Sequence, residues 1–560
     1  MNKRSIRILE YEKVLEMLEK YAVTQGAKKK VQNLKPRTDK TLIESMQQNT
    51  RDSYIRIEQF GQVSFSGVRD IRESLRMLEI DSTLTAAELL DIASLLETAF
   101  EVKNYGTVTH SGENYYDSLT AFFDLLMPLQ DISSEIRRCI ISSDEIADDA
   151  SSNLRSIRRK IVSSEAELHT TLNKIIHNAN NRDMLMDALV TTRNGRYCIP
   201  VKIEHKNAFP GLVHDRSSSG STVFIEPLQV VELNNSIQEL HTDEKLEIDK
   251  ILTDLSLLAG SAKDDILENY KALIELDFCF AKAKFAKATN ASQPIYTDNG
   301  TIELKQAIHP LLDPKTAVPI DLKLGQDYNL LIITGPNTGG KTVSLKTLGL
   351  LTLMAQSGLH IPAAEGSRIA IFEDVFADIG DEQSIELSLS TFSSHMSNII
   401  YIVKHANDKS LVLFDEPGGG TDPAEGAALA ISILNNLKDK GARVMATTHY
   451  TELKTYAIAT EGVENASCEF DMKSLRPTYR LMIGVPGSSN AFAIASRLGM
   501  PDEITNAARS EMDESQLHME QVINQLEESE REMSRLREEL EIETNSAKQL
   551  RIRLSDKEKK

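Results

Sequence analysis

One short run constrains the fold of this 560-residue chain more than any other feature. Residues 335–342 read Gly-Pro-Asn-Thr-Gly-Gly-Lys-Thr, after an apolar segment at 330–334 and before a helical run that we expect to begin at Val343. A glycine-rich turn between a buried strand and a helix lets backbone N–H groups converge on phosphate oxygens. The run therefore predicts a nucleotide site at the end of a parallel sheet, with these binding residues: Gly335, Pro336, Asn337, Thr338, Gly339, Gly340, Lys341 and Thr342.

The side chains at the end of this loop fit a nucleotide carried by magnesium. We expect Lys341 to neutralise the β- and γ-phosphates and Thr342 to give Mg²⁺ a hydroxyl ligand. A second apolar run, 411–414, ends in Asp415 and Glu416. Asp415 is expected to hold Mg²⁺ through water, and Glu416 to orient or deprotonate an attacking water. These residues predict ATP and Mg²⁺ as cofactors.

A third apolar run, 443–447, leads to His449. A histidine at that position is expected to sense the γ-phosphate, so the predicted catalytic residues are Glu416, His449 and Lys341. Together with a run at 368–372, these segments alternate with helical sequence, which is typical of an α/β domain with a largely parallel sheet. Composition shifts near residue 293, and we predict that this P-loop domain of the ABC type occupies residues 291–510.

The sequence before this domain is mostly helical. We predict an N-terminal helical core at 1–130 and a long-helix lever at 131–290, interrupted at 196–227 by two or three short strands. An apolar stripe from 228 to about 285 predicts one continuous lever helix. In the last segment, 511–560, apolar residues recur every seven positions, which favours a coiled-coil tail. Ser529 and Glu543 interrupt its second seam, so a solvated helix lying on its own domain is the alternative.

Composition restricts the class of protein further. The formal net charge is −20, with 41% hydrophobic and 26% charged residues, which is ordinary for a soluble globular chain. No apolar run approaches the roughly 20 residues that cross a bilayer, and no apolar segment follows Met1. The four cysteines are scattered without metal-ligand spacing. We therefore expect a cytoplasmic protein that has no membrane partner.

Local basic clusters are candidates for contact with nucleic acid despite the acidic total. The candidates are a helical face with Arg155, Arg158 and Arg159, and the strand insertion with Arg196 and Lys202. Aromatic residues make up only 5% of the chain, so a surface that follows phosphates is favoured over one that stacks bases. Solvated helix faces are the plain alternative for such charge runs.

Four motifs, in this order and spacing, resemble the ATPase domain of MutS proteins: the run at 335–341, Ser390-Thr-Phe392, Asp415-Glu-x-Gly-x-Gly-Thr421 and Thr447-Thr-His449. Segments at 199–227 and 420–427 resemble one subfamily, the second bacterial MutS paralogue. The resemblance covers essentially the whole chain. It implies a homodimer whose ATPase domains pair head to tail. Ser390, followed by Thr391, would then reach the γ-phosphate held by the partner's Lys341, while Asn337 would contact phosphates in cis.

The chain departs from the wider family at three places. It begins directly in helical sequence, where mismatch-repair MutS has a domain with a Phe-x-Glu wedge, and Phe224-Ile-Glu226 matches that wedge only by coincidence. A Leu-Asp-Leu-His-Gly type motif of the subfamily's small nuclease domain does not occur in the sequence. Either the chain is truncated or it depends on a separate nuclease, and we expect endonuclease activity only in family members that carry that domain. Pro417 stands where the subfamily more often has leucine. Proline is common there in the wider ABC class, so hydrolysis is still expected.

The resemblance implies a function for the whole chain. We expect an ATP-hydrolysing dimeric clamp on structured nucleic acid, acting on branched DNA to limit homologous recombination, on ribosomal RNA in stalled or collided ribosomes, or on both. The alternative is a nucleotide-switched scaffold that recruits a partner, such as a nuclease, through its coiled-coil tail. A chromosome-organising ATPase fits poorly, because there a very long coil separates the two phosphate-site motifs.

Overall fold

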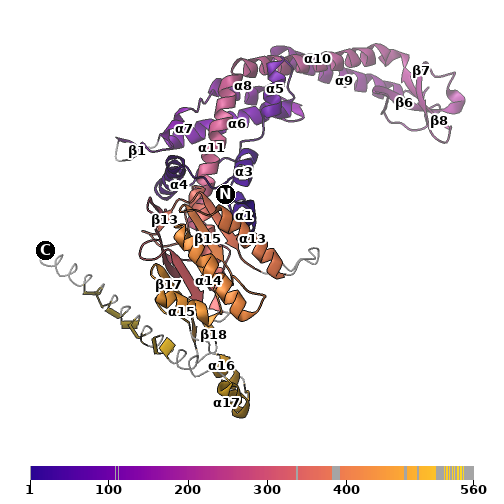
Figure 1. The fold of residues 1–560 in the computed structure, drawn as a ribbon. Helices are drawn as coiled ribbons and strands as arrows, with labels where there is room; N and C mark the ends of the chain where they lie inside the picture. The colour runs from indigo at the N-terminus through magenta and orange to yellow at the C-terminus, as the bar shows by residue number, and fades with distance from the viewer. Residues whose placement is uncertain are drawn as a thin grey trace.

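The computed structural model describes residues 2–107, 109–110, 113–335, 339–380, 391–471, 476–487, 491–497 and 499–511, with scattered positions between 522 and 547. An elongated outline is visible in Figure 1, with a sheet-containing part, a helical body and a protruding arm. The chain is thus multidomain, with helices and mixed sheets, as predicted. The boundaries placed at 130, 290 and 510 stay predictions. Nearly all of the predicted coiled-coil tail lies outside the described residues.

The helical body comes from the N-terminal part of the chain. Its helices are α1 (Lys3–Ile8), α2 (Tyr11–Glu19), α3 (Gln25–Gln32), α4 (Lys40–Phe60), α5 (Arg72–Glu79), α6 (Ala86–Gly106), α7 (Thr120–Asp124) and α8 (Gln130–Cys139), with two small hairpins, β1 (Thr109–His110) with β2 (Glu113–Asn114) and β3 (Ile140–Ser142) with β4 (Glu145–Ile146). A capping box formed by Thr85 and Glu88 starts α6. Leu89, Ile92 and Leu96 on α6 are fully buried in the core of this body.

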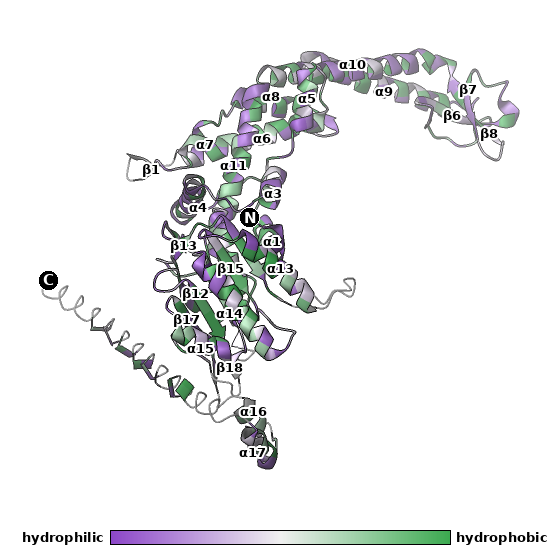
Figure 2. Cartoon of the chain, in the orientation of Figure 1, coloured by the Kyte–Doolittle hydropathy of each residue, from purple (hydrophilic) through white to green (hydrophobic). Residues whose placement is uncertain are grey.

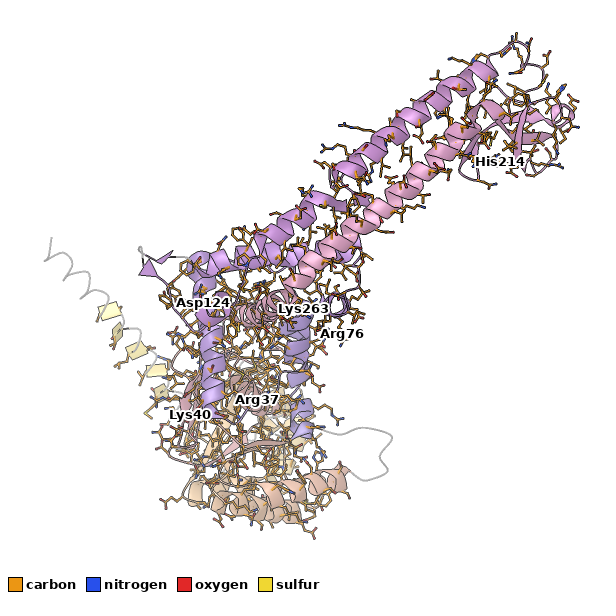
Figure 3. The ribbon with its side chains drawn as sticks, turned by 90° about the horizontal axis from the view of Figure 1, so that it is seen from above. Arg37, Lys40, Arg76, Asp124, His214 and Lys263 are labelled. Atoms are coloured by element: carbon orange, nitrogen blue, oxygen red, sulfur yellow. The ribbon has the colours of Figure 1, made fainter. Side chains whose placement is uncertain are left out.

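The arm is a pair of long helices with a small sheet at its far end (Figure 3). Helix α9 (Ser152–Ile176) packs along α10 (Val231–Ser261). The tip sheet has the order β5-β6-β8-β7, formed by β5 (Thr191–Arg193), β6 (Arg196–Lys202), β7 (Gly211–Arg216) and β8 (Thr222–Pro227). The tip therefore has four strands and begins at residue 191, before the predicted start at 196. The strand that was not predicted, β5, forms a hairpin with β6. Its two turn residues, Asn194 and Gly195, both have positive φ, as is typical of an Asn-Gly hairpin turn.

The predicted continuous lever helix is wrong, because the structure divides it. Helix α10 ends at Ser261, and α11 (Lys263–Ala288) begins after Ala262, whose ψ of 21° leaves the helical range. Gly260 and Ser261 are poor helix formers at the break. Asp264 and Asp265 then favour a new helix start, where acidic side chains meet the positive end of the helix dipole.

Helix α11 connects the helical body to the sheet-containing part. Its Phe280 packs in the core of the body, while Phe285 packs in the core of the sheet. The N-terminal helices reach the same sheet, since Leu9 and Leu18 are buried in its core and Ser5 Oγ accepts a hydrogen bond from Ala377 N. The sheet is therefore packed against helices from the N-terminus and from the middle of the chain.

The main sheet has six strands, and it is largely parallel as predicted. Its order is β14-β15-β16-β12-β17-β18, formed by β14 (Asp374–Asp378), β15 (Ser410–Phe414), β16 (Arg443–Thr447), β12 (Leu330–Thr334), β17 (Val463–Asp471) and β18 (Arg476–Ile483). Only the β17–β18 pair is antiparallel. Strands β12 and β15 are buried along their whole length and are drawn in green in Figure 2, as expected for strands covered on both faces.

Helices cover this sheet and a smaller sheet adjoins it. The helices are α12 (Lys341–Gln356), α13 (Thr391–His405), α14 (Pro423–Asp439) and α15 (Thr451–Ala459), followed by α16 (Ala491–Arg497) and α17 (Asp502–Ser510). The smaller sheet has the order β11-β10-β13-β9, formed by β9 (Ile295–Thr297), β10 (Ile302–Ala307), β11 (Ile320–Leu324) and β13 (Arg368–Ala370). The predicted run 368–372 therefore belongs to the smaller sheet and ends early. Helix α12 begins at Lys341, two residues before the predicted start.

Within the described part of the chain, no helix has both the length and the hydropathy needed to span a bilayer. All four cysteines are buried and unpaired.

Candidate nucleotide site

The site is assembled where parallel strands end at one edge of the main sheet. Strand β15 lies between β14 and β16, and β12 lies next to β16. Asp415 and Glu416 follow β15, while His449 comes shortly after β16. The loop from Gly335 leads from β12 into α12. Carboxyl ends of neighbouring parallel strands are the usual place for ligands in such sheets, because successive loops meet there.

Lys341, Glu416 and His449 lie close together at this edge, and their predicted catalytic roles stay predictions. Lys341 Nζ lies 2.8 Å from His449 Nε2 and 3.8 Å from Glu416 Oε1, and His449 Nε2 lies 3.0 Å from the same Glu416 oxygen. The Lys341 side chain is only 1% exposed. A buried ammonium held beside a carboxylate is a focused positive centre for an anionic ligand.

Burial and contact with neighbouring groups shift the pKa values of Lys341 and Glu416. Burial lowers the pKa of Lys341, against the opposing effect of the Glu416 and Asp415 carboxylates. The pKa of Glu416 is lowered chiefly by its hydrogen bond with His449, against the opposing effect of burial. A carboxylate that stays ionised beside the Lys341 ammonium is suited to accept a hydrogen bond or a proton from water.

Asp415 is oriented by two hydroxyl groups. Thr342 Oγ1 donates to Asp415 Oδ2 at 2.8 Å, and Thr447 Oγ1 donates to the other oxygen. The sequence motifs indicate Thr342 and Asp415 as magnesium ligands but give Thr447 no role. Hydroxyl and carboxylate oxygens are ligands that Mg²⁺ prefers, usually few in number and completed by phosphate and water. Among the described residues, no cluster of three or more His, Cys, Asp or Glu side chains suited to a metal occurs.

The backbone of the site needs unusual conformations. Gly335 has φ of 123°, and a Cβ there would lie 3.3 Å from the carbonyl oxygen of Cys468. Gly340 has φ of 94° at the start of α12. Glu416 is not a glycine, yet its φ is 51°, in the left-handed region. Strain of this kind persists where surrounding contacts enforce it, and here the Glu416 N–H donates to Thr447 O and Oγ1.

A cavity of about 370 Å³ opens beside these residues. Its lining includes Thr342, Asp415, Glu416 and the glycines of residues 418–420, together with Asp378 and His395. Sequence reasoning missed Asp378 and gave His395 no role. The available signal for Asp378 was its position at the end of an apolar run, the same position that pointed to Asp415.

Several predicted site residues fall outside the described structure. Pro336, Asn337, Thr338 and Ser390 belong to this group. Thr391 is the first residue of α13, and nothing is described of its side chain. Their roles stay predictions.

The predicted nucleic-acid residues lie on the arm, away from this site. Arg158 Nε forms an ion pair with Glu244 Oε1 at 2.8 Å across the two arm helices. Arg196 Nη1 forms an ion pair with the fully buried Glu226 carboxylate at 2.8 Å. Arg155 lies 3.5 Å from Asp149, and Lys202 Nζ donates to Asp183 O. Arg159 is exposed and has no ion-pair partner within the described ranges. The predicted shared face is thus divided between structural and solvent-facing arginines.

Comparison with known proteins agrees with this geometry. The MutS domain V family matches residues 331–516. Endonuclease MutS2 of Lachnospira eligens is 54% identical over 527 residues, which make up 94% of this chain and 66% of that protein. The protein of that name from Lachnoclostridium phytofermentans is 52% identical over 533 residues (94% and 67%), and that from Geobacillus sp. is 47% identical over 529 residues (94% and 68%). The chain spans about two thirds of the length of these curated relatives.

Proposed function

This chain belongs to the MutS2 family, and from that premise we propose that it is an ATP-hydrolysing dimeric clamp on structured nucleic acid. The observation that carries the proposal is the convergence of Lys341, Glu416 and His449 at the carboxyl ends of adjacent parallel strands. The relatives are named endonucleases, and our proposal for this chain does not include that activity. The proposed domains are a helical core at 1–130, a lever at 131–290, a P-loop ATPase domain at 291–510 and a coiled-coil tail at 511–560.

In this proposal each residue of the site has a separate role in ATP hydrolysis. Lys341 binds the β- and γ-phosphates, where its buried ammonium balances their charge. Thr342, through its hydroxyl, and the hydroxyl-oriented Asp415, through water, would hold Mg²⁺. Magnesium, when bound, offsets the negative charge on the phosphates during transfer. Glu416 orients the attacking water and accepts its proton, and His449 keeps the Glu416 carboxylate in place.

The dimer and the clamp extend the proposal beyond the described site. In this proposal Ser390 of each subunit completes the site of the other, so that the two ATPase domains close only around bound nucleotide. The arm carries this closure to the nucleic acid, which is branched DNA in recombination intermediates, ribosomal RNA in stalled or collided ribosomes, or both. Support for the arm as the contact is its length and the exposed Arg159 on α9.

Substitution of Glu416 tests the hydrolysis step. We expect Glu416→Gln to bind ATP and remain dimeric while turnover falls by roughly 100-fold or more, because the amide cannot accept the proton. Steady-state phosphate release and nucleotide binding are measured together. Glu425→Gln is the matched control, because Glu425 is exposed in the first turn of α14 and outside the site. Full turnover in Glu416→Gln would remove Glu416 from this role.

A panel of ligands tests the clamp. Binding to four-way junctions, linear duplex DNA and ribosomes is compared with and without ATP across a salt series. We expect ATP-dependent preference for junctions or ribosomes over linear duplex. Tight binding to none of the three would instead favour the nucleotide-switched scaffold.

A further inference from the structure

The buried Asp378 and the neighbouring His395 form a pair inside the nucleotide cavity that the proposed mechanism does not use. We propose that His395, oriented by Asp378, is a positioning residue for the water shell of the magnesium ion. The inference rests on the proposed function, since it concerns the Mg²⁺ that accompanies the nucleotide. It adds a second histidine to the site, with a role distinct from that of His449.

Strand pairing places Asp378 beside the predicted magnesium ligand. Asp378 ends β14 and is paired with Phe414 at the end of β15, and the Asp415 N–H donates to Asp378 O at 2.8 Å. The Asp378 side chain is 4% exposed. Its Oδ2 lies 2.8 Å from His395 Nδ1, and its Oδ1 accepts a hydrogen bond from Asn398 Nδ2 at 2.9 Å. The carboxylate is thus fixed through both oxygens.

This contact selects the tautomer of His395. A carboxylate oxygen only accepts hydrogen bonds, so Nδ1 of the neutral imidazole carries the proton and Nε2 is an acceptor. His395 lines the same cavity as Thr342 and Asp415, and the latter two are the residues proposed to hold Mg²⁺. A water bound to Mg²⁺ is a strong hydrogen-bond donor, and an imidazole acceptor matches it. In many metal sites a carboxylate accepts a hydrogen bond from a histidine and thereby fixes the orientation of that histidine near the metal.

The strand order separates the roles of the two histidines. Strand β15, which leads to Asp415 and Glu416, has β14 on one side and β16 on the other. His449 follows β16 and contacts Glu416, while His395 is anchored to the end of β14. We therefore assign His449 to the carboxylate that handles the attacking water and His395 to the metal side.

The fold of α13 does not depend on His395 alone. Asn398 Nδ2 also donates to Ala377 O at 3.2 Å, and Ile399 and Ile402 are buried in the core beneath the helix. Removal of the imidazole should therefore leave α13 docked on β14. The effect of a His395 substitution can then be attributed to the cavity rather than to loss of the helix.

The test measures how much Mg²⁺ strengthens nucleotide binding. Binding of a fluorescent ATP analogue is titrated with excess Mg²⁺ and with chelator, in wild type, His395→Ala and Asp378→Asn. Mg²⁺ strengthens nucleotide binding by a certain factor in wild type, and we expect that factor to be about 10-fold smaller in both variants. Losses of this size are typical of residues that orient a metal's ligands. Affinity in chelator should stay within about twofold of wild type, because the phosphate contacts of Lys341 are intact.

Asp378→Asn is the sharper of the two variants, because it keeps the shape of the side chain. An amide that donates to Nδ1 forces the proton onto Nε2 and removes the acceptor. His405→Ala is the control on the same helix, since its Nδ1 contacts only its own turn at Tyr401 O. If both variants fold and their nucleotide binding depends on Mg²⁺ as in wild type, the inference about His395 is overturned and the proposed function is not. Failure of wild-type protein to bind the analogue, with Lys341→Ala no worse, would instead overturn the proposed function and the inference with it.

Discussion

At the scale of single residues, burial controls how this protein responds to acid. His309 and His360 are buried, and burial is the main reason that the pKa of each is lowered to about 4. Lys282 and Arg51 lower the pKa of His360 further by charge repulsion. His360 also lines a cavity of about 870 Å³ between α4 and residues 290–294, where its Nε2 has no partner within the described structure.

The sign of the resulting pH dependence follows from proton binding. Between pH 6.5 and about 4 the unfolded histidine binds a proton that the folded one excludes, so the free energy of unfolding falls as pH falls through this window. Each such histidine contributes up to about 3 kcal/mol to this fall in the free energy of unfolding. We expect His360→Gln to melt with a shallower dependence on pH than wild type, because the substitution removes one of these two histidines. Equal slopes for the two proteins would contradict this assignment.

Residues within sequence motifs could be predicted, and residues joined only by strand order could not. The sequence indicates four site residues because each lies at a fixed spacing from an apolar run: Gly335, Lys341, Asp415 and Glu416. Asp378 and Thr447 enter the site because β14 and β16 flank β15. Strand order is decided by packing of the whole sheet, which no local pattern encodes. The role of His395 depends on the same order.

At the scale of elements, the break between α10 and α11 marks where the arm joins the body. Lys263, labelled in Figure 3, is the first residue of α11. The apolar stripe runs through this break, so hydrophobic periodicity alone predicted one helix. Gly260 and Ser261 were the local signal, and they weaken a helix only modestly, by about 1 kcal/mol or less for each residue.

Substitution of Gly260 tests this reading of the junction. Gly260 lies in the last turn of α10, and a Cβ there would meet only Leu78 Cδ2 at 3.9 Å, an ordinary contact. We expect Gly260→Ala to stabilise the protein by about 0.5–1 kcal/mol, because alanine loses less backbone freedom on folding. Gly106→Ala at the end of α6 is the opposite case, since its Cβ would lie 2.3 Å from the Phe123 ring and should destabilise the fold. Denaturant midpoints that move in the same direction for both would contradict this account.

The arm helices offer a test that separates structural from functional charge. Arg158 is bonded to Glu244 on α10, whereas its neighbour Arg159 is exposed. We expect Arg159→Ala to weaken binding to all nucleic-acid ligands alike and to lower the salt slope by about 1. Arg158→Ala should instead reduce stability and leave the salt slope unchanged. A loss of salt slope in Arg158→Ala but not in Arg159→Ala would reverse the assignment.

At the scale of the whole molecule, the nucleotide site and the arm tip are separated by the helical body. Their connection runs through α11, which is buried in both cores, and then through α10. Packed helices transmit rigid-body movement, so closure of two ATPase domains would displace the arm tips. The order of the parts along the chain was predictable from composition and periodicity. Contact of α1–α3 with the sheet was not, because it joins segments more than 300 residues apart.

The central claim is that each nucleotide lies between two copies of this chain. Mixing Lys341→Ala with Ser390→Ala and measuring ATP turnover after subunit exchange tests this most directly. A mixed dimer regains one intact site, made of Lys341 from one subunit and Ser390 from the other, so an equal mixture should recover about a quarter of wild-type turnover although each variant alone is inactive. Turnover no higher than that of the separate variants, with exchange verified by differential tags, would contradict the claim.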